Sequence, residues 1–445
     1  MPIRDIIVIT LVGLLAVYAF KRPFFGAVLW VWLGVMNPHR LGWGFAYSMP
    51  FAQFAAGVTL LSIFLNRQQA RWPAGAPINW MLLLAFWMAI TSVSAFIVEA
   101  SLERYIDFLK VVLMTLAVGA VMRTREQVVG MVWVMAVSLG FFGIKGGVFT
   151  IATGGAHRVW GPTSSFIEGN NELAVGLIMT IPLMYFLVQE SAIAAQWPGF
   201  KRLGEKWIRR GLYSAMGLSA IAAIGSQSRG ALLAIIAMGS VLWWRSKAKL
   251  PLALAAIGLG VLVLLAAPDA WFERMATIRT YEEDGSAMGR INAWIMAINV
   301  ANDRITGAGF AFASAFIYQM YAPDPSMVLV AHSNYFQILG EHGYIGLALF
   351  LFMWLSAYRT AGFLIRIGRD VAELQWAVHF GSMAKVSIVG FSVGGAFLNL
   401  AYWEMPYYLI AALVAAKLLV NEHLKGVTPQ MQRGVHFSGF ANGTR

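Results

Sequence analysis

The feature that most constrains this chain is its succession of long apolar segments. A helix that crosses a bilayer needs about 20 mostly apolar residues, with a usual range of about 17–25. Runs of this kind without a charged residue occur at Ile78–Val98, Gln127–Ile144, Leu173–Gln189, Gly211–Ser228, Leu250–Pro268, Gly343–Tyr358 and Val386–Trp403. The sequence therefore predicts an all-α polytopic membrane protein.

Shorter or lightly interrupted apolar segments add further candidates. They are Ile6–Phe20, Pro23–Asn37, Ser48–Leu65, Tyr105–Val121, Gly230–Trp244 and Met405–Val420. Together with the longer runs they predict 12 or 13 crossings. The first two segments are separated only by Lys21-Arg22, so a tilted hairpin that does not fully span remains an alternative for them.

The composition agrees with a membrane protein. Charged residues make up only 12% of the chain, against about 25% in an ordinary soluble domain. So few charges could not cover a water-exposed surface, which excludes a soluble enzyme. The chain has no Cys, which excludes disulfides, thiolate metal sites and cysteine catalysis.

The basic residues are distributed unevenly between the two faces that alternating segments create. Short connections on one face hold only Arg40, Arg104, Arg158 and Arg229. The other face holds Lys21, Arg22, Arg67, Arg71, Arg123, Arg125, Lys201, Arg202, Lys206, Arg209, Arg210, Arg245, Lys247, Lys249, Arg359, Arg366 and Arg369. Lys and Arg are enriched in cytoplasmic loops, so this second face is predicted to be cytoplasmic. The net charge of +12 then needs no nucleic acid to explain it.

This topology divides the chain into four parts. We expect N-terminal transmembrane helices over 1–268, a long periplasmic loop over 269–335, C-terminal transmembrane helices over 336–420 and a cytoplasmic tail over 421–445. Within the long loop, Ser286–Asn302 is predicted to form an amphipathic helix. Arg290 and Trp294 lie four residues apart and so share one face of it.

Several cations lie at the predicted outer ends of helices. Arg229 follows the short turn Ser226-Gln227-Ser228, Arg158 lies in a glycine-rich loop, Arg290 opens the amphipathic helix, and Lys145 interrupts an apolar helix. Each of them alone could extend to the lipid headgroups or pair with an acid. Taken together, they favour an anion site, because guanidinium groups bind phosphate oxygens in a bidentate manner. We expect no metal, since no paired acids, paired His or Cys lie near these residues.

His332 differs from the other histidines because it lies where the long loop returns to an apolar helix. A helix N-terminus disfavours protonation of imidazole and keeps it able to accept a proton. The sequence therefore favours His332 as a general base for a hydroxyl nucleophile, and a His that only packs at the interface is the alternative.

Three motifs, taken together, resemble the O-antigen ligase family. They are Ser226-Gln227-Ser228-Arg229-Gly230, then Ser286-x-x-x-Arg290-x-x-x-Trp294 with Gly307-x-Gly309, and finally His332-Ser333-Asn334-Tyr335 with Glu341-His342-Gly343-x-x-Gly346. The resemblance covers roughly residues 211–420. It implies a GT-C-like membrane glycosyltransferase that uses neither a nucleotide sugar nor a metal or other cofactor.

The resemblance also implies substrates and residue roles. The donor would be a polysaccharide on undecaprenyl diphosphate, and the acceptor would be the lipid A-core at the periplasmic face of the inner membrane. His332 would be the base, and Arg229 and Arg290 would hold the diphosphate. Arg158 lies in a loop where the family pattern is looser, and it is expected as a further diphosphate ligand, as is Lys145, because both belong to the cations at the outer face. Asn334, Tyr335, Trp294 and Glu341 would support them.

Three alternatives remain open from the sequence. An O-antigen polymerase would use a second lipid-linked glycan as acceptor, and a protein O-glycosylation ligase would use a protein. A transporter or flippase for a lipid-linked glycan would place its binding charges near the middle of the membrane. The predicted charges lie instead at one face, which favours chemistry there.

Overall fold

The computed structural model describes residues 3–42, 44–245 and 285–435, together with isolated positions between 249 and 272. Within these residues every regular element is a helix. The predicted segment Leu250–Pro268 and the first part of the predicted long loop lie largely outside the described residues.

The helices of the N-terminal half are α1 (Ile3–Lys21), α2 (Pro23–Met36), α3 (Phe51–Leu65), α4 (Ala76–Val93), α5 (Val98–Val121), α6 (Arg125–Ala152), α7 (Asn170–Gln189), α8 (Ser191–Ala194), α9 (Gly204–Gly225) and α10 (Arg229–Arg245). Those of the C-terminal half are α13 (Gly285–Asp303), α14 (Ala315–Tyr321), α15 (Asn334–Gly368), α16 (Gln375–Gly394) and α17 (Glu404–Val435). Short 3-10 turns join several of them, among them η1 (Pro38–Leu41), η2 (Phe45–Ser48), η4 (Ala372–Leu374) and η5 (Gly395–Phe397).

The described apolar segments all form helices, as predicted. Seven helical stretches are long and apolar enough to cross a membrane, and they involve α1, α4, α6, α7, α15, α16 and α17. Three more apolar helices, α2, α3 and α10, are shorter. The chain is therefore a polytopic helical membrane protein. Some predicted boundaries were wrong. The predicted segment Ile78–Val98 continues past the end of α4 at Val93. Helix α16 ends at Gly394, and the predicted remainder of that segment contains the turn η5 and an irregular stretch up to Trp403.

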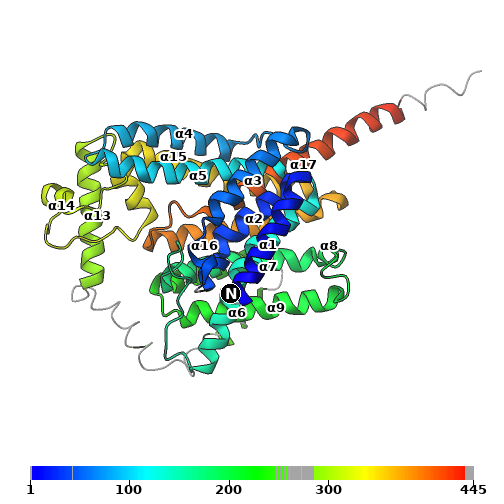
Figure 1. Ribbon diagram of the computed structural model, residues 1–445, viewed down its shortest axis with the longest axis horizontal. Coiled ribbons are helices and arrows are strands. Elements are labelled where there is room, and N and C mark those ends of the chain that lie inside the picture. Colours follow the sequence, from blue (N-terminus) through cyan, green and yellow to red (C-terminus); the bar gives the residue numbers. More distant parts are fainter. Residues whose placement is uncertain are drawn as a thin grey trace, which may run out of the picture.

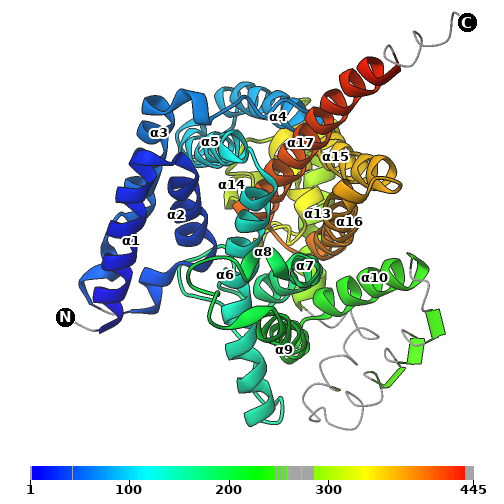
Figure 2. The ribbon, with the colours of Figure 1, turned by 90° about the vertical axis from the view of Figure 1, so that its right-hand side faces the viewer.

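The interior of the bundle is built around α7 and α17. From Met405 to Ala416 the side chains of α17 are almost all fully buried, and α7 is buried over most of its length. Helix α7 packs against α6, α9 and α16, while α15 packs against α4 and α16. Figure 2 shows α17 passing between α5 and the pair α15 and α16.

The connections gather at two ends of the bundle. At one end, which we call the α13 end, Arg304 of the α13–α14 connection donates to the carbonyl oxygen of Ser94, and Asn170 donates to that of Ser226. At the opposite end, Arg125 pairs with Glu190 at 2.5 Å and Arg71 pairs with Glu422. Figure 1 shows α13 and α14 at one end of the molecule, far from the end of α17. Connections distant in sequence thus meet at the α13 end.

A break inside α15 explains the glycines of the third motif. Gly343 has φ +66° and ψ −172°, a conformation that is essentially restricted to glycine. The break leaves carbonyl groups without their helical partners, and other segments supply replacements. The backbone N–H groups of Ala308 and Gly309 donate to the carbonyls of Gly340 and Glu341, each at 2.9 Å. Trp87 Nε1 donates to the carbonyl of His342 at 2.8 Å. The break is therefore compatible with a membrane interior.

Candidate active site

The turn before α10 fixes the position of Arg229. The Asn170 side chain, at the start of α7, donates from Nδ2 to the carbonyl oxygen of Ser226 at 2.8 Å. The Ser228 hydroxyl accepts a hydrogen bond from the backbone N–H of Ala231 at 3.1 Å, in the manner of a helix N-cap. Arg229 is the first residue of α10 and is partly buried. The Arg229 guanidinium group is thus carried by the N-terminus of α10, and a hydrogen bond holds the turn before α10 against the N-terminus of α7.

Gln227 joins this turn to the connection between α6 and α7. Its backbone is left-handed, with φ +56°, and its side chain donates from Nε2 to the carbonyl of Gly155 at 3.1 Å. The same amide accepts a long contact of 3.5 Å from Arg158 Nε. Arg158 is therefore linked, through Gln227, to the turn that carries Arg229.

Arg290 lies between an acid and the candidate base. It occupies the second turn of α13 and acts electrostatically on the Glu172 carboxylate in the first turn of α7. It also acts on His332, whose pKa it helps to lower. Arg290 thus connects the α7 side of the site, where Asn170 contacts the Arg229 turn, to His332.

The backbone of His332 is held in an uncommon conformation by both of its neighbours. His332 has φ +45°, in the left-handed region that L-residues rarely adopt. On one side, Trp294 Nε1 donates to the carbonyl of Ala331 at 2.7 Å. On the other side, the N–H of Ser333 donates to Asn399 Oδ1 at 3.1 Å. Conformations of this kind persist only where the surroundings enforce them, and they are frequent at functional sites.

His332 is neutral at physiological pH. Burial, and second the positive charge of Arg290, lower its pKa from 6.5 to about 4. Its Nδ1 atom is buried and has no hydrogen-bond partner among the described residues. A neutral imidazole carries one nitrogen lone pair that can accept a proton. The group therefore has the protonation state that a general base requires.

Trp294 and Asn334 contact the segment on either side of the histidine. The Trp294 ring stacks on Phe336, with ring centroids 4.8 Å apart and planes 12° apart. Asn334 Oδ1 accepts a hydrogen bond from the N–H of Leu400 at 2.6 Å. The Trp294 side chain thus packs α13 against α15. The Asn334 side chain connects the start of α15 to the segment before α17.

Two of the predicted supporting residues lie within the helix packing. The Tyr335 hydroxyl donates to the carbonyl of Ser392 at 2.8 Å and so fixes α15 to α16. Glu341 is almost fully buried and accepts hydrogen bonds from the Tyr402 hydroxyl and, at 3.3 Å, from Gln337. His342 contacts the same Tyr402 hydroxyl at 3.0 Å. These contacts join α15 to the connection before α17.

The structure does not bring Lys145 to the arginines. Its side chain is exposed on α6, on the same face as the exposed residues Ile144, Val148 and Phe149. No hydrogen bond or ion pair in the described part of the chain involves it. An ammonium group in such a position is explained by extension of its stem along an apolar surface toward water.

Four residues of the site were not predicted from the sequence: Asn170, Glu172, Gln227 and Asn399. The signal for the first two was present, since three polar residues, Asn170, Asn171 and Glu172, open an otherwise apolar helix. No local signal marks Asn399, which reaches the site only because α15 and the connection before α17 are neighbours.

The arrangement combines cations and helix N-termini with a neutral histidine. The N-termini of α10 and α15 both meet the turn η5, because Gly230 packs against Phe397 and Gly395 packs against Asn334. Helix N-termini carry partial positive charge and free N–H groups. With Arg158, Arg229 and Arg290 they create a positive region, and the neutral His332 lies beside one of these cations. Such a site suits attack on a carbon that bears an anionic leaving group.

Two family models match parts of the chain. A model described as O-antigen ligase matches residues 214–351, which contain Arg229, Arg290 and His332. A model for a family of unknown function matches residues 3–192. No curated protein matches the chain.

Proposed function

Since residues 214–351 form an O-antigen ligase domain, we propose that this protein is a GT-C-like membrane glycosyltransferase of the O-antigen ligase type. It transfers a polysaccharide from undecaprenyl diphosphate to a hydroxyl of the lipid A-core. The reaction takes place at the periplasmic face of the inner membrane, which is the α13 end, and the opposite basic end is cytoplasmic.

The observation that carries this proposal is the proximity of Arg290 to a neutral His332. A transferase of this kind needs a cation that binds the donor diphosphate and, close to it, a base that binds the acceptor hydroxyl. An anion site alone would also suit a transporter or flippase. A neutral histidine with a left-handed backbone beside the cation favours a catalytic site over a transport site.

The reaction proceeds by direct displacement. His332 removes the proton from an acceptor sugar hydroxyl while that oxygen attacks the anomeric carbon of the donor. The bond from this carbon to the diphosphate oxygen breaks, and its electron pair leaves with undecaprenyl diphosphate. Arg229, Arg290 and Arg158 bind the phosphate oxygens and stabilise the charge that develops there. Displacement from the opposite face inverts the anomeric carbon.

No metal is needed for this step. The leaving diphosphate is stabilised by guanidinium groups and helix N-termini. These groups supply positive charge at the position where negative charge develops on the leaving oxygen. The diphosphate therefore leaves without a divalent ion and without a nucleotide.

Two acceptors other than the lipid A-core follow from the same geometry. A polymerase would transfer the glycan to a second lipid-linked glycan, and a protein ligase would transfer it to a protein hydroxyl. The base and the cations would act identically in all three, so the acceptor is decided outside the residues described above.

Purified protein in nanodiscs tests the proposal. It is incubated with an undecaprenyl-diphosphate glycan and lipid A-core in the presence of excess chelator, and gel mobility reports the product. We expect polysaccharide on the lipid A-core. Lengthening of the lipid-linked glycan alone would identify a polymerase, and activity that requires an added divalent ion would refute the arginine mechanism.

A further inference from the structure

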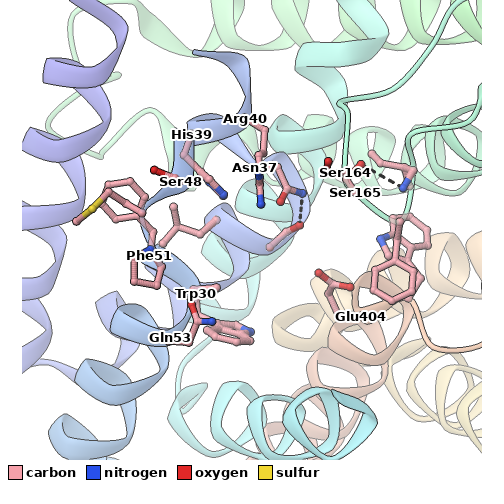
Figure 3. Close-up of a pocket in the computed structure, with 18 residues that line it drawn as sticks. Trp30, Asn37, His39, Arg40, Ser48, Phe51, Gln53, Ser164, Ser165 and Glu404 are labelled. Atoms are coloured by element: carbon pink, nitrogen blue, oxygen red, sulfur yellow. Dashed lines mark hydrogen bonds between the residues drawn. The ribbon is translucent and has the colours of Figure 1, made fainter. Parts of the chain in front are cut away.

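A concave feature lies at the α13 end, outside the residues assigned to the reaction. It is a cavity of about 440 Å³ bounded by the end of α2, the connection to α3, residues 164–167 and the start of α17 (Figure 3). Its volume falls in the range of about 300–1,000 Å³ that is usual for small-molecule sites.

The lining combines aromatic rings with hydrogen-bonding groups. Trp30, Phe51 and Trp403 supply aromatic surface, while His39, Gln53 and Glu404 supply donors and acceptors. A sugar ring has the matching chemistry, because it has apolar C–H faces and a rim of hydroxyl groups. Aromatic rings pack on the faces, and polar side chains bond to the rim.

Two polar atoms in the lining lack partners. His39 is 8% exposed, and its Nδ1 atom makes no hydrogen bond among the described residues. The same is true of the buried Oε2 atom of Glu404. Burial and the neighbouring Arg40 lower the pKa of His39 to about 4, so its ring is neutral. A buried polar atom without a partner is destabilising, and a ligand hydroxyl would satisfy it. Figure 3 shows both side chains among those that line the cavity.

Two chain segments connect the cavity to the candidate active site. Residues 164–167 belong to the same connection as Arg158. Glu404 follows five residues after Asn399, whose side chain is bonded to Ser333 beside His332. An acceptor held in the cavity would therefore extend toward the base.

The cavity and the three residues Arg229, Arg290 and His332 come from different parts of the chain. All lining residues except Trp403 and Glu404 lie within residues 3–192, the part that matches a family of unknown function. None of the lining residues lies within the O-antigen ligase domain at 214–351. The part that carries Arg229, Arg290 and His332 is thus separate from the part that forms the cavity.

We propose that this cavity binds a sugar residue of the acceptor glycan, with the ring on the aromatic surface and its hydroxyls bonded to His39 and Glu404. The proposal rests on the proposed transferase function, since that function defines an acceptor. It assigns acceptor selection to the N-terminal region and the start of α17.

Calorimetric titration of the full chain in nanodiscs tests the assignment with two probes. One is the core oligosaccharide released from lipid A, and the other is the donor polysaccharide released from its diphosphate. Glu404→Gln replaces the carboxyl group with an amide of similar volume, and Ser48→Trp adds an indole at an exposed position of the lining. Glu99→Gln makes the same substitution at an exposed position at the start of α5, outside the cavity.

We expect the unchanged protein to bind the core oligosaccharide, and Glu404→Gln and Ser48→Trp each to weaken this binding by about tenfold or more. Glu99→Gln should retain it. Absence of binding to the unchanged protein would overturn the proposal, and so would binding by both cavity variants as tight as that of the unchanged protein. Weakened binding of the donor polysaccharide instead would place the donor in the cavity and overturn the acceptor assignment.

Transfer measured in the same preparations separates this proposal from the function itself. Oligosaccharide binding that depends on the cavity but occurs without any transfer would refute the transferase mechanism and leave the cavity assignment standing. Normal transfer by Glu404→Gln and Ser48→Trp, with an unchanged KM for the acceptor, would refute the cavity assignment alone.

Discussion

Trp294 Nε1 donates a hydrogen bond of 2.7 Å to the carbonyl oxygen of Ala331, the residue directly before His332. The same indole stacks on Phe336, four residues after the histidine. One side chain of α13 therefore contacts the chain on both sides of the candidate base and fixes its backbone at φ +45°. This makes Trp294 a positioning residue.

Replacing Trp294 with Phe tests this role. The phenyl ring preserves much of the stacking on Phe336 but cannot donate to Ala331. A hydrogen bond contributes about 0.5–1.5 kcal/mol, so we expect kcat to fall a few-fold to about tenfold while donor KM changes little. Trp72→Phe, at an exposed indole near the opposite end, is the control. An unchanged kcat would contradict the positioning role.

Replacing His332 with Ala removes the base and leaves the arginines. General base catalysis contributes about 10²–10⁴-fold, so transfer should fall by that factor while the donor lipid still binds. Rates and donor affinity are compared at equal protein level with His423→Ala, at the other end of the molecule. Near-normal transfer by His332→Ala would mean that another group is the base.

The pH dependence follows from the lowered pKa of His332. A pKa of about 4 means that the base is neutral above that pH, so kcat/KM should rise through about pH 4 and be level near neutrality. Arg290→Ala removes one of the two causes of the lowered His332 pKa, the positive charge of Arg290. The acid limb of the pH profile should therefore move to higher pH. It should stay below pH 6.5, because the burial of His332 persists. An acid limb near 6.5 in the unchanged protein would contradict the site.

Arg290 can also be tested by a conservative replacement. Arg290→Lys retains the charge beside His332 but loses the bidentate geometry toward phosphate. We expect it to recover part of the donor binding that Arg290→Ala loses, while its acid limb stays close to that of the unchanged protein. Full recovery of donor binding would show that charge alone is sufficient.

The break in α15 predicts a stability effect. Gly343→Ala places a Cβ in a conformation that is essentially restricted to glycine, near the carbonyl of Ile305, and such strain costs about 1–3 kcal/mol. The midpoint of thermal unfolding in nanodiscs should fall. Gly57→Ala, in α3 with open space around it, should leave the midpoint unchanged or raise it. Equal midpoints for the two variants would contradict this account of the break.

The orientation is tested by reporter fusions. Pro325 lies in an exposed connection at the α13 end, and Gly199 lies in an exposed connection between α8 and α9. A reporter inserted after Pro325 should read periplasmic, and one after Gly199 cytoplasmic. The reverse result for either fusion would place the candidate site on the wrong face for a periplasmic ligase.

The sequence alone determined the helices, because crossing a bilayer demands a length and an apolar character that any single segment displays by itself. It also located His332 at the start of a helix and three arginines at helix ends or in a loop, since these are local positions. Only the tertiary structure decided which of these residues meet. It linked Arg290 to Glu172 and His332, left Lys145 on an exposed apolar face, and buried Glu341 against Tyr402. It also formed one cavity from residues near positions 40, 165 and 404. Such contacts depend on how the helices pack against one another, and helix packing leaves no periodic mark in the sequence around each residue.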